Sequence, residues 1–195
     1  TIKVCLITDS IMRHIRDLES TCRHKYSFTR IDRRDSSGLC SPNTRDELKR
    51  QRPHIVYIHL GINDIHRGDE PSGVIDNLRD FQHFLDDWLP ETRLVISLPL
   101  PNGHEHQERT IAQLRSSMAL YASQRPSSTD RKRIYIQHNN NMTVGGNDQE
   151  LRQNHLFFLS NDRVHLSDRG KSAMYHCFRG TLYRIFKGLD SERPH

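Results

Sequence analysis

The chain has 195 residues, a length that suits one domain with a substantial hydrophobic core. Only 34% of the residues are hydrophobic and 27% are charged, yet clear apolar runs remain, which excludes global disorder. No apolar stretch has the length of a membrane span or the pattern of a signal peptide. The net charge of +5 permits contact with nucleic acid or acidic surfaces.

The cysteines and the first residue bear on the setting of the chain. Four cysteines are scattered without CxxC spacing, which favours reduced thiols and an intracellular location: Cys5, Cys22, Cys40 and Cys177. Because the chain starts at Thr1 rather than Met, we expect a piece of a longer protein.

Apolar, β-rich runs alternate with segments of helical periodicity along the chain. The predicted strands are Ile2–Ile7, Tyr26–Ile31, Ile55–Leu60, Leu94–Leu98 and Ile134–Gln137. The apolar stripes of the predicted helices are Met12 and Ile15; Val74, Leu78, Phe81, Leu85 and Trp88; Ile111, Leu114, Met118 and Tyr121; and Met174, Phe178, Leu182 and Ile185. A further helix is expected from Pro42 to Gln51, and the longest loop from Asn139 to Asn154.

This alternation predicts an α/β fold with a five-stranded parallel sheet between two helical layers, a flavodoxin-like α/β/α sandwich. We expect a single domain over residues 1–188 and a polar tail over 189–195. In such sheets functional residues gather beyond the carboxyl ends of the strands.

Two polar residues follow predicted strands at that edge. Ser10 opens the first helix, where it is either a helix N-cap or a nucleophile beside backbone N–H groups. Asn63, in Gly61-Ile62-Asn63-Asp64, is either a turn residue or an amide that binds an oxyanion.

A histidine with its own carboxylate stands near the C-terminus. Asp162 precedes His165 by three residues, so in a turn it can accept the ring Nδ1–H and leave Nε2 free as a base. The alternative is a pair of polar loop residues. Together with Ser10 and Asn63, the pair supplies the parts of a serine esterase.

Three blocks, Asp9-Ser10, Gly61-Ile62-Asn63-Asp64 and Asp162-Arg163-Val164-His165, resemble the SGNH (GDSL-type) hydrolases, and the similarity runs from Thr8 to His165. The resemblance implies Ser10 as nucleophile and Asp162 with His165 as the base. It also implies an oxyanion hole made by the Ser10 N–H, the Asn63 side chain and the N–H of a glycine after the second strand, which Gly38 matches by position. Thr8 stands where the family usually has glycine, which puts full activity in question.

Within that family, Asp9–Ile15 and Asn161–Ser167 look like the esterase domains of first-reading-frame proteins of animal LINE-type retrotransposons. This resemblance implies a cytoplasmic or ribonucleoprotein setting with RNA nearby. We expect hydrolysis of small or medium acyl esters, acetyl esters and lipids included, in a pocket lined by Pro99–Pro101 and Asn139–Met142.

Two alternatives stay open. One is a catalytically weak SGNH-like module that binds RNA or protein through basic clusters around Arg30–Arg34, Lys49–Arg52 and Arg131–Arg133. The other is a metal site at His104 and His106, but this segment offers no third ligand at helical or strand spacing, so we expect neither metal nor cofactor.

Overall fold

The computed structural model describes residues 1–13, 26–124, 133–144 and 152–191, with side chains up to residue 187. His14, Ile15, Cys22, Arg131 and Lys132 therefore lie outside the described residues. The described cysteines Cys5, Cys40 and Cys177 are free thiols.

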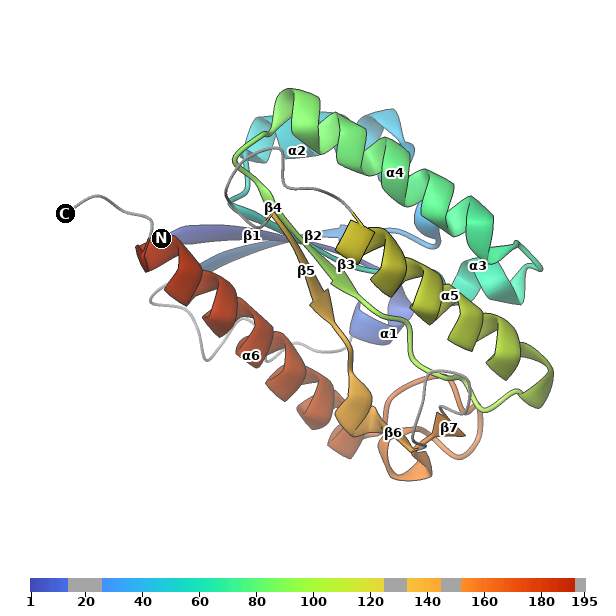
Figure 1. The fold of residues 1–195 in the computed structure, drawn as a ribbon. Coiled ribbons are helices and arrows are strands. Elements are labelled where there is room, and N and C mark those ends of the chain that lie inside the picture. The colour runs from blue at the N-terminus through green and yellow to red at the C-terminus, as the bar shows by residue number, and fades with distance from the viewer. Residues whose placement is uncertain (14–25, 125–132, 145–151, 192–195) are drawn as a thin grey trace.

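A five-stranded parallel sheet forms the centre of the domain (Figure 1), as the sequence predicts. Its strands, in chain order, are β1 (Ile2–Thr8), β2 (Tyr26–Asp32), β3 (Ile55–His59), β4 (Arg93–Ser97) and β5 (Ile134–Gln137). They lie side by side in the order β2-β1-β3-β4-β5, and all neighbours run parallel. The order reverses direction between β1 and β3, where open α/β sheets form their binding crevice.

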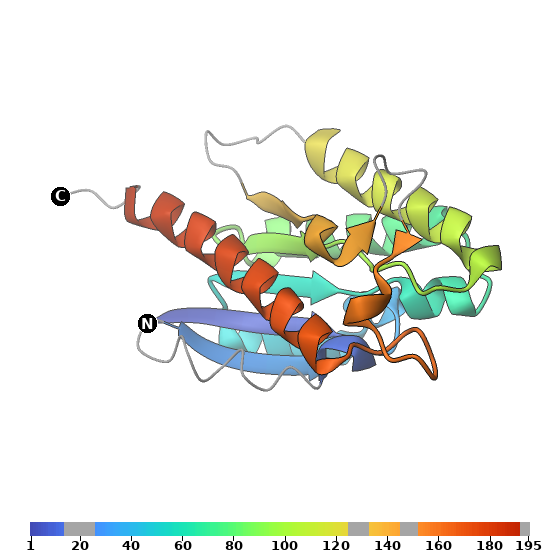
Figure 2. The same cartoon turned by 90° about the horizontal axis from the view of Figure 1, so that it is seen from below.

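Helices cover both faces of this sheet (Figures 1 and 2). One face carries α2 (Pro42–Gln51), α4 (Pro71–Trp88) and α5 (Glu105–Gln124), and the other carries α1 (Ser10–Arg13) and α6 (Asp168–Ser191). Phe178 of α6 packs edge-on against Tyr57 of β3, with 4.9 Å between ring centroids. The fully buried strands β3 and β4 are mostly apolar because both of their faces are covered.

The helical stripes predicted from the sequence point into the core, with one exception. The three predicted stripes of α4, α5 and α6 are buried, from Val74 to Leu85, Ile111 to Tyr121 and Met174 to Ile185. Trp88, predicted to end the α4 stripe in the core, is instead 57% exposed. The Lys49 ammonium lies 3.7 Å from the centroid of its ring, so a cation–π contact covers the indole at the surface.

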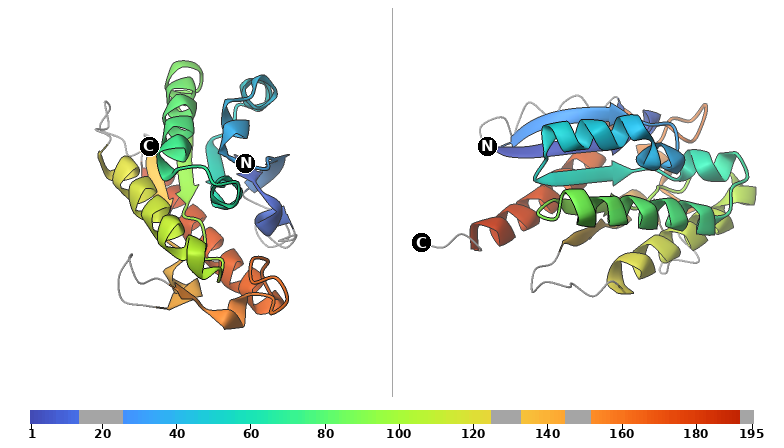
Figure 3. Two further views of the ribbon diagram at one scale, coloured as in Figure 1. Left: turned by 90° about the vertical axis from the view of Figure 1, so that its right-hand side faces the viewer. Right: turned by 90° about the horizontal axis from the view of Figure 1, so that it is seen from above.

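Short elements gather at the carboxyl edge of the sheet (Figure 3), and periodicity did not predict them. They are the 3-10 helix η2 (Ser36–Cys40), α3 (Ile62–His66), η3 (Asn140–Met142), the strands β6 (Thr143–Val144) and β7 (Arg152–Gln153), and η4 (His155–Phe157). The predicted loop from Asn139 to Asn154 therefore contains a small antiparallel pair, β6 with β7.

The last helix, α6, continues to Ser191, into the segment predicted as a tail. The domain boundary at residue 188 stays a prediction. Among the described helices, none combines the length and the apolar character needed to span a bilayer.

Candidate active site

Ser10 lies directly beyond β1, at the first position of α1. The buried Asp9 carboxylate accepts the Ile11 N–H at 2.9 Å, which is how an N-cap side chain satisfies a helix start. Asp9 thus fills the capping role that the sequence also allowed for Ser10. The Ser10 side chain is partly exposed at the strand edge.

The turn after β3 presents Asn63 on α3. Gly61 begins this turn with φ 117°, and a Cβ there would lie 2.9 Å from Leu114 Cδ2, so the position requires glycine. The Asn63 Nδ2 donates to the Arg34 carbonyl at 2.7 Å, across to the loop that follows β2. Asn63 is therefore a helix residue with its amide reaching across the edge, rather than a turn residue.

Gly38 lies within η2, and its N–H donates to the Asp35 carbonyl at 3.2 Å. In the proposed oxyanion hole the same Gly38 N–H would have to donate to the substrate instead. The backbone that lies beside the Asn63 amide belongs to Arg34, earlier in the same loop.

A buried carboxylate holds this loop against α3. Asp64 accepts the Ser36 hydroxyl at 2.6 Å and the Ser36 N–H at 3.1 Å, and Asn77 Nδ2 donates to the same hydroxyl at 2.8 Å. Burial raises the pKa of the Asp64 carboxyl, although the Ser36 bonds act in the opposite direction. The sequence analysis did not predict a role for Asp64, although its position next to Asn63 was a signal that it supports the site.

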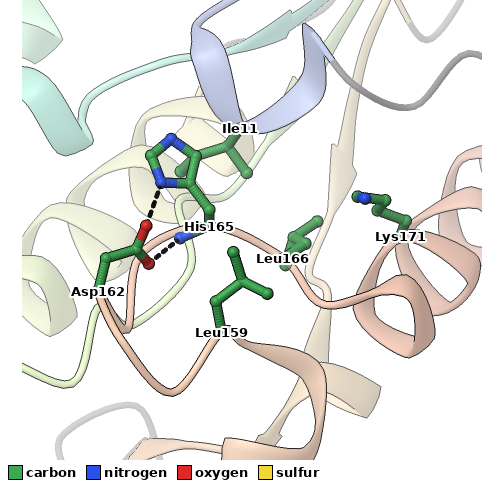
Figure 4. A pocket seen from close by; sticks show the side chains of 6 residues that line it. All are labelled: Ile11, Leu159, Asp162, His165, Leu166 and Lys171. Atoms are coloured by element: carbon green, nitrogen blue, oxygen red, sulfur yellow. Dashed lines mark hydrogen bonds and ion pairs between the residues drawn. The ribbon is translucent and has the colours of Figure 1, made fainter.

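Asp162 and His165 form the pair that the sequence predicted. His165 Nδ1 lies 2.6 Å from Asp162 Oδ2, and the His165 N–H donates to Asp162 Oδ1 at 2.9 Å (Figure 4). The Val164 N–H also donates to Asp162 Oδ1 at 2.9 Å. Desolvation raises the pKa of Asp162, but the two N–H groups and the imidazole outweigh it and hold that pKa below its usual value. An ionised carboxylate fixes the ring with Nε2 turned away from it.

The loop around this pair is closed by its own backbone. Phe158 and Leu166 form an antiparallel bridge, and the Leu159 N–H donates to the His165 carbonyl at 2.9 Å. Arg163 takes φ 56°, a left-handed conformation that is uncommon for a side chain of this type. The histidine is therefore presented by a tight turn rather than by an extended segment.

A pocket of about 250 Å³ opens beside the imidazole. Figure 4 shows the six residues that line it: Ile11, Leu159, Asp162, His165, Leu166 and Lys171. Ile11 follows Ser10 directly, so the start of α1 and the Asp162–His165 loop meet at this pocket. Ser10, Gly38 and Asn63 are not among the lining residues.

The residues expected to line an acyl pocket, on the loops after β4 and β5, do not line the pocket beside His165. Leu100 and Met142 are buried in the core, and Asn139 Nδ2 donates to Ser97 Oγ and to the Leu98 carbonyl. The pocket beside His165 is lined instead by Ile11 and by residues between Leu159 and Lys171, and the acyl pocket at the expected loops stays a prediction.

Thr8, at the usual glycine position, is buried at the end of β1. Its carbonyl accepts the Arg33 N–H at 3.0 Å, while its hydroxyl, within the described part of the chain, has no hydrogen-bond partner. Whether Thr8 lowers activity stays a prediction.

His104 and His106 lie near His66, with 6.0 Å between the first two ring centroids and 6.2 Å between His66 and His104. Asn102 Nδ2 lies 2.8 Å from His66 Nε2. Over the ranges that the structure describes, no three His, Cys, Asp or Glu side chains are grouped closely enough to hold a metal ion.

Several side chains of the basic clusters have partners within the domain. Arg33 Nε donates to Thr44 Oγ1 at 2.7 Å, and Arg133 pairs with Asp86 at 2.8 Å. The Asp86 carboxylate offsets the charge of Arg133, whereas the bond to the neutral Thr44 hydroxyl leaves the charge of Arg33 unchanged.

Comparison with known structures gives the class of fold. A carbohydrate esterase family 3 protein from Talaromyces cellulolyticus superposes with a TM-score of 0.74 at 15% identity, over 96% of this chain and 99% of that one. A mutant acetyl esterase with an acetate ion gives 0.74 at 14% identity, over 97% and 100%. A GDSL-like lipase from Bacteroides thetaiotaomicron gives 0.70 at 18% identity, over 94% and 88%.

The protein therefore has the α/β fold of the SGNH, or GDSL-type, hydrolases. Scans of the sequence against protein-family models and against curated proteins match nothing.

Proposed function

We propose that the protein is a serine esterase with Ser10 as its nucleophile. The observation that carries this proposal is the meeting of the Asp162–His165 pair and the start of α1 at one pocket beyond the carboxyl ends of the strands. Fold neighbours whose names describe esterases and lipases support the same class of reaction.

In the proposed reaction, His165 Nε2 takes the Ser10 hydroxyl proton as the Ser10 oxygen attacks the ester carbonyl. The alcohol leaves with that proton, and an acyl-enzyme remains on Ser10. His165 then takes a proton from water, the hydroxide attacks the acyl carbonyl, and Ser10 regains its proton as the acid leaves. Asp162 holds the imidazole in the required tautomer throughout.

We assign the oxyanion hole to the Ser10 N–H, the Asn63 amide and one backbone N–H of the loop after β2. The sequence assigned that last donor to Gly38. Gly38 keeps that role in the proposal, and its N–H, which donates to the Asp35 carbonyl at 3.2 Å, would have to turn to the substrate; the Arg34 group beside the Asn63 amide is a carbonyl, which cannot donate. Removal of one such donor typically lowers kcat about 100- to 1,000-fold.

A small acyl group fits the proposed site. The pocket of about 250 Å³ is smaller than the ~300 Å³ at the lower end of drug-sized ligand sites. Its walls are largely apolar, from Ile11, Leu159 and Leu166. An acetate ion in one neighbour agrees with a short acyl chain, so acetyl esters are the first substrates to test.

The test is covalent labelling and turnover in one experiment. Wild type should react with a fluorophosphonate probe and hydrolyse p-nitrophenyl acetate, and Ser10→Ala should lose both. Ser123→Ala is the matched control, because Ser123 is exposed on α5 and its hydroxyl donates only to the Leu120 carbonyl. A folded wild type that neither labels nor turns over ester would refute the esterase.

The second candidate is a catalytically weak module that binds RNA or protein, with a cytoplasmic or ribonucleoprotein location and a retrotransposon origin. The net charge of +5 and the exposed Arg34 beside the site favour RNA over a neutral partner. Binding would be electrostatic, so a gel shift with single-stranded RNA should weaken steeply between 50 and 200 mM salt, on the order of ten-fold or more for each few phosphate contacts. Retention of RNA without salt dependence would contradict it.

A further inference from the structure

The pocket beside His165 contains one basic side chain that the proposed reaction does not use. Lys171, on the first turn of α6, lines the pocket together with Ile11, Leu159 and Leu166 (Figure 4). The apolar side chains form most of the wall of the pocket, and the ammonium adds a positive charge to it.

The present partner of Lys171 holds it weakly. Its Nζ lies 3.0 Å from Asp168 Oδ1, but the Asp168 side chain is fully exposed while that of Lys171 is 37% exposed. An ion pair with one partner entirely in water contributes little, so exchange of Asp168 for a ligand anion costs little.

The acidic residue of the pocket does not compete for this ammonium. Both oxygens of Asp162 are engaged, one by two backbone N–H groups and the other by the His165 ring. A negative group of the substrate would therefore meet Lys171 in a partly desolvated pocket, where a charge-assisted bond is stronger than in water.

We propose that Lys171 selects esters that carry an anionic group, such as a carboxylate, on the part of the molecule that enters this pocket. The proposal rests on the esterase function proposed above. The small volume places the anionic group only a few atoms from the ester carbonyl, as in a monoester of a short dicarboxylic acid.

The experiment compares matched esters in the whole domain. The first pair is p-nitrophenyl butyrate and p-nitrophenyl hemisuccinate, which have acyl groups of equal length. The second pair is phenyl acetate and 3-acetoxybenzoate, which places the charge on the leaving group instead. The measured quantity is the ratio of kcat/KM for the anionic ester to that for its neutral partner.

We expect wild type to favour the anionic ester in one of the two pairs, and Lys171→Met to lower that ratio about ten-fold. Lys171→Arg should restore most of it, and Lys171→Glu should lower it further. Lys187→Met is the matched control, because Lys187 lies on the same helix over the Tyr183 ring, 5.1 Å from its centroid, and its ratio should equal that of wild type. Because each ratio is taken within one protein, partial loss of folding cancels.

Equal ratios for wild type and Lys171→Met in both pairs, with turnover of the neutral esters intact, would overturn the role of Lys171 alone. Absence of turnover and of Ser10 labelling in folded wild type would overturn the esterase, and the substrate preference with it.

Discussion

Two glycines of α6 should respond in opposite ways to the same substitution. A Cβ on Gly170 would lie 1.9 Å from the Phe157 carbonyl oxygen, whereas a Cβ on Gly180 meets nothing within 4 Å. An ordinary contact begins near 3.4 Å, so Gly170→Ala must separate the helix from η4 by roughly 1.5 Å. The Phe157 carbonyl also accepts the Ser167 N–H at 2.9 Å, which resists that movement.

We expect Gly170→Ala to cost about 3 kcal/mol or more, as overpacking against backbone does. Gly180→Ala should stabilise the exposed helix by about 0.5–1 kcal/mol, because alanine loses less backbone entropy on folding. At roughly 2–4 °C per kcal/mol for a domain of this size, the melting temperature should fall by about 6–12 °C in the first variant and rise by about 1–4 °C in the second.

The two variants should also differ in activity. Movement of η4 shifts the turn that bears His165, and a displacement of about 1 Å can lower the rate about 100-fold. Thermal denaturation and hydrolysis of p-nitrophenyl acetate measure both effects. Similar melting temperatures for the two variants would show that α6 and η4 do not pack as described.

Three further predictions concern substitutions at His59, Asp162 and Gly38. Burial, with a smaller contribution from Arg115, lowers the pKa of His59 from 6.5 to about 4. Between these two pH values the histidine is protonated in the unfolded chain but neutral in the folded protein. The contribution of His59 to the free energy of unfolding is therefore complete above pH 6.5, and about 3 kcal/mol is lost as the pH falls to 4. His59→Gln, which can keep the bond to Ser97, should flatten that part of the curve in chemical denaturation at several pH values. Asp162→Asn should lower kcat by about 10²- to 10⁴-fold with little change in melting temperature, and an unchanged kcat would remove Asp162 from the site. Gly38→Ala keeps its N–H but brings a Cβ within 2.6 Å of Arg33 Cδ, so we expect a loss of about 1–3 kcal/mol in stability, and a variant as stable as wild type would contradict this packing.

The sheet could be predicted from the sequence because strands covered on both faces have near-continuous apolar runs, as Ile55–His59 does. The hydrogen bond between Asp162 and His165 could also be predicted, because a spacing of three residues in a turn brings the two side chains together. Both features depend on neighbours in sequence.

Features that depend on distant neighbours were missed. The contact of the Asn63 amide with the Arg34 carbonyl, 29 residues away, has no local signal in the sequence. Trp88 keeps helical period but lies where α4 passes beyond the core, and Lys49 of another helix covers it. Neither contact can be predicted from the residues next to it in the sequence.

The turn from Asp162 to His165 is self-contained, since the carboxylate binds two amides and the imidazole within four consecutive residues. Because these bonds lie within the turn itself, a shift of the turn relative to Ser10 leaves the pairing of carboxylate and imidazole intact. In the proposed esterase, the placement of this one turn therefore decides whether the imidazole reaches Ser10, while the pairing that sets its tautomer stays the same.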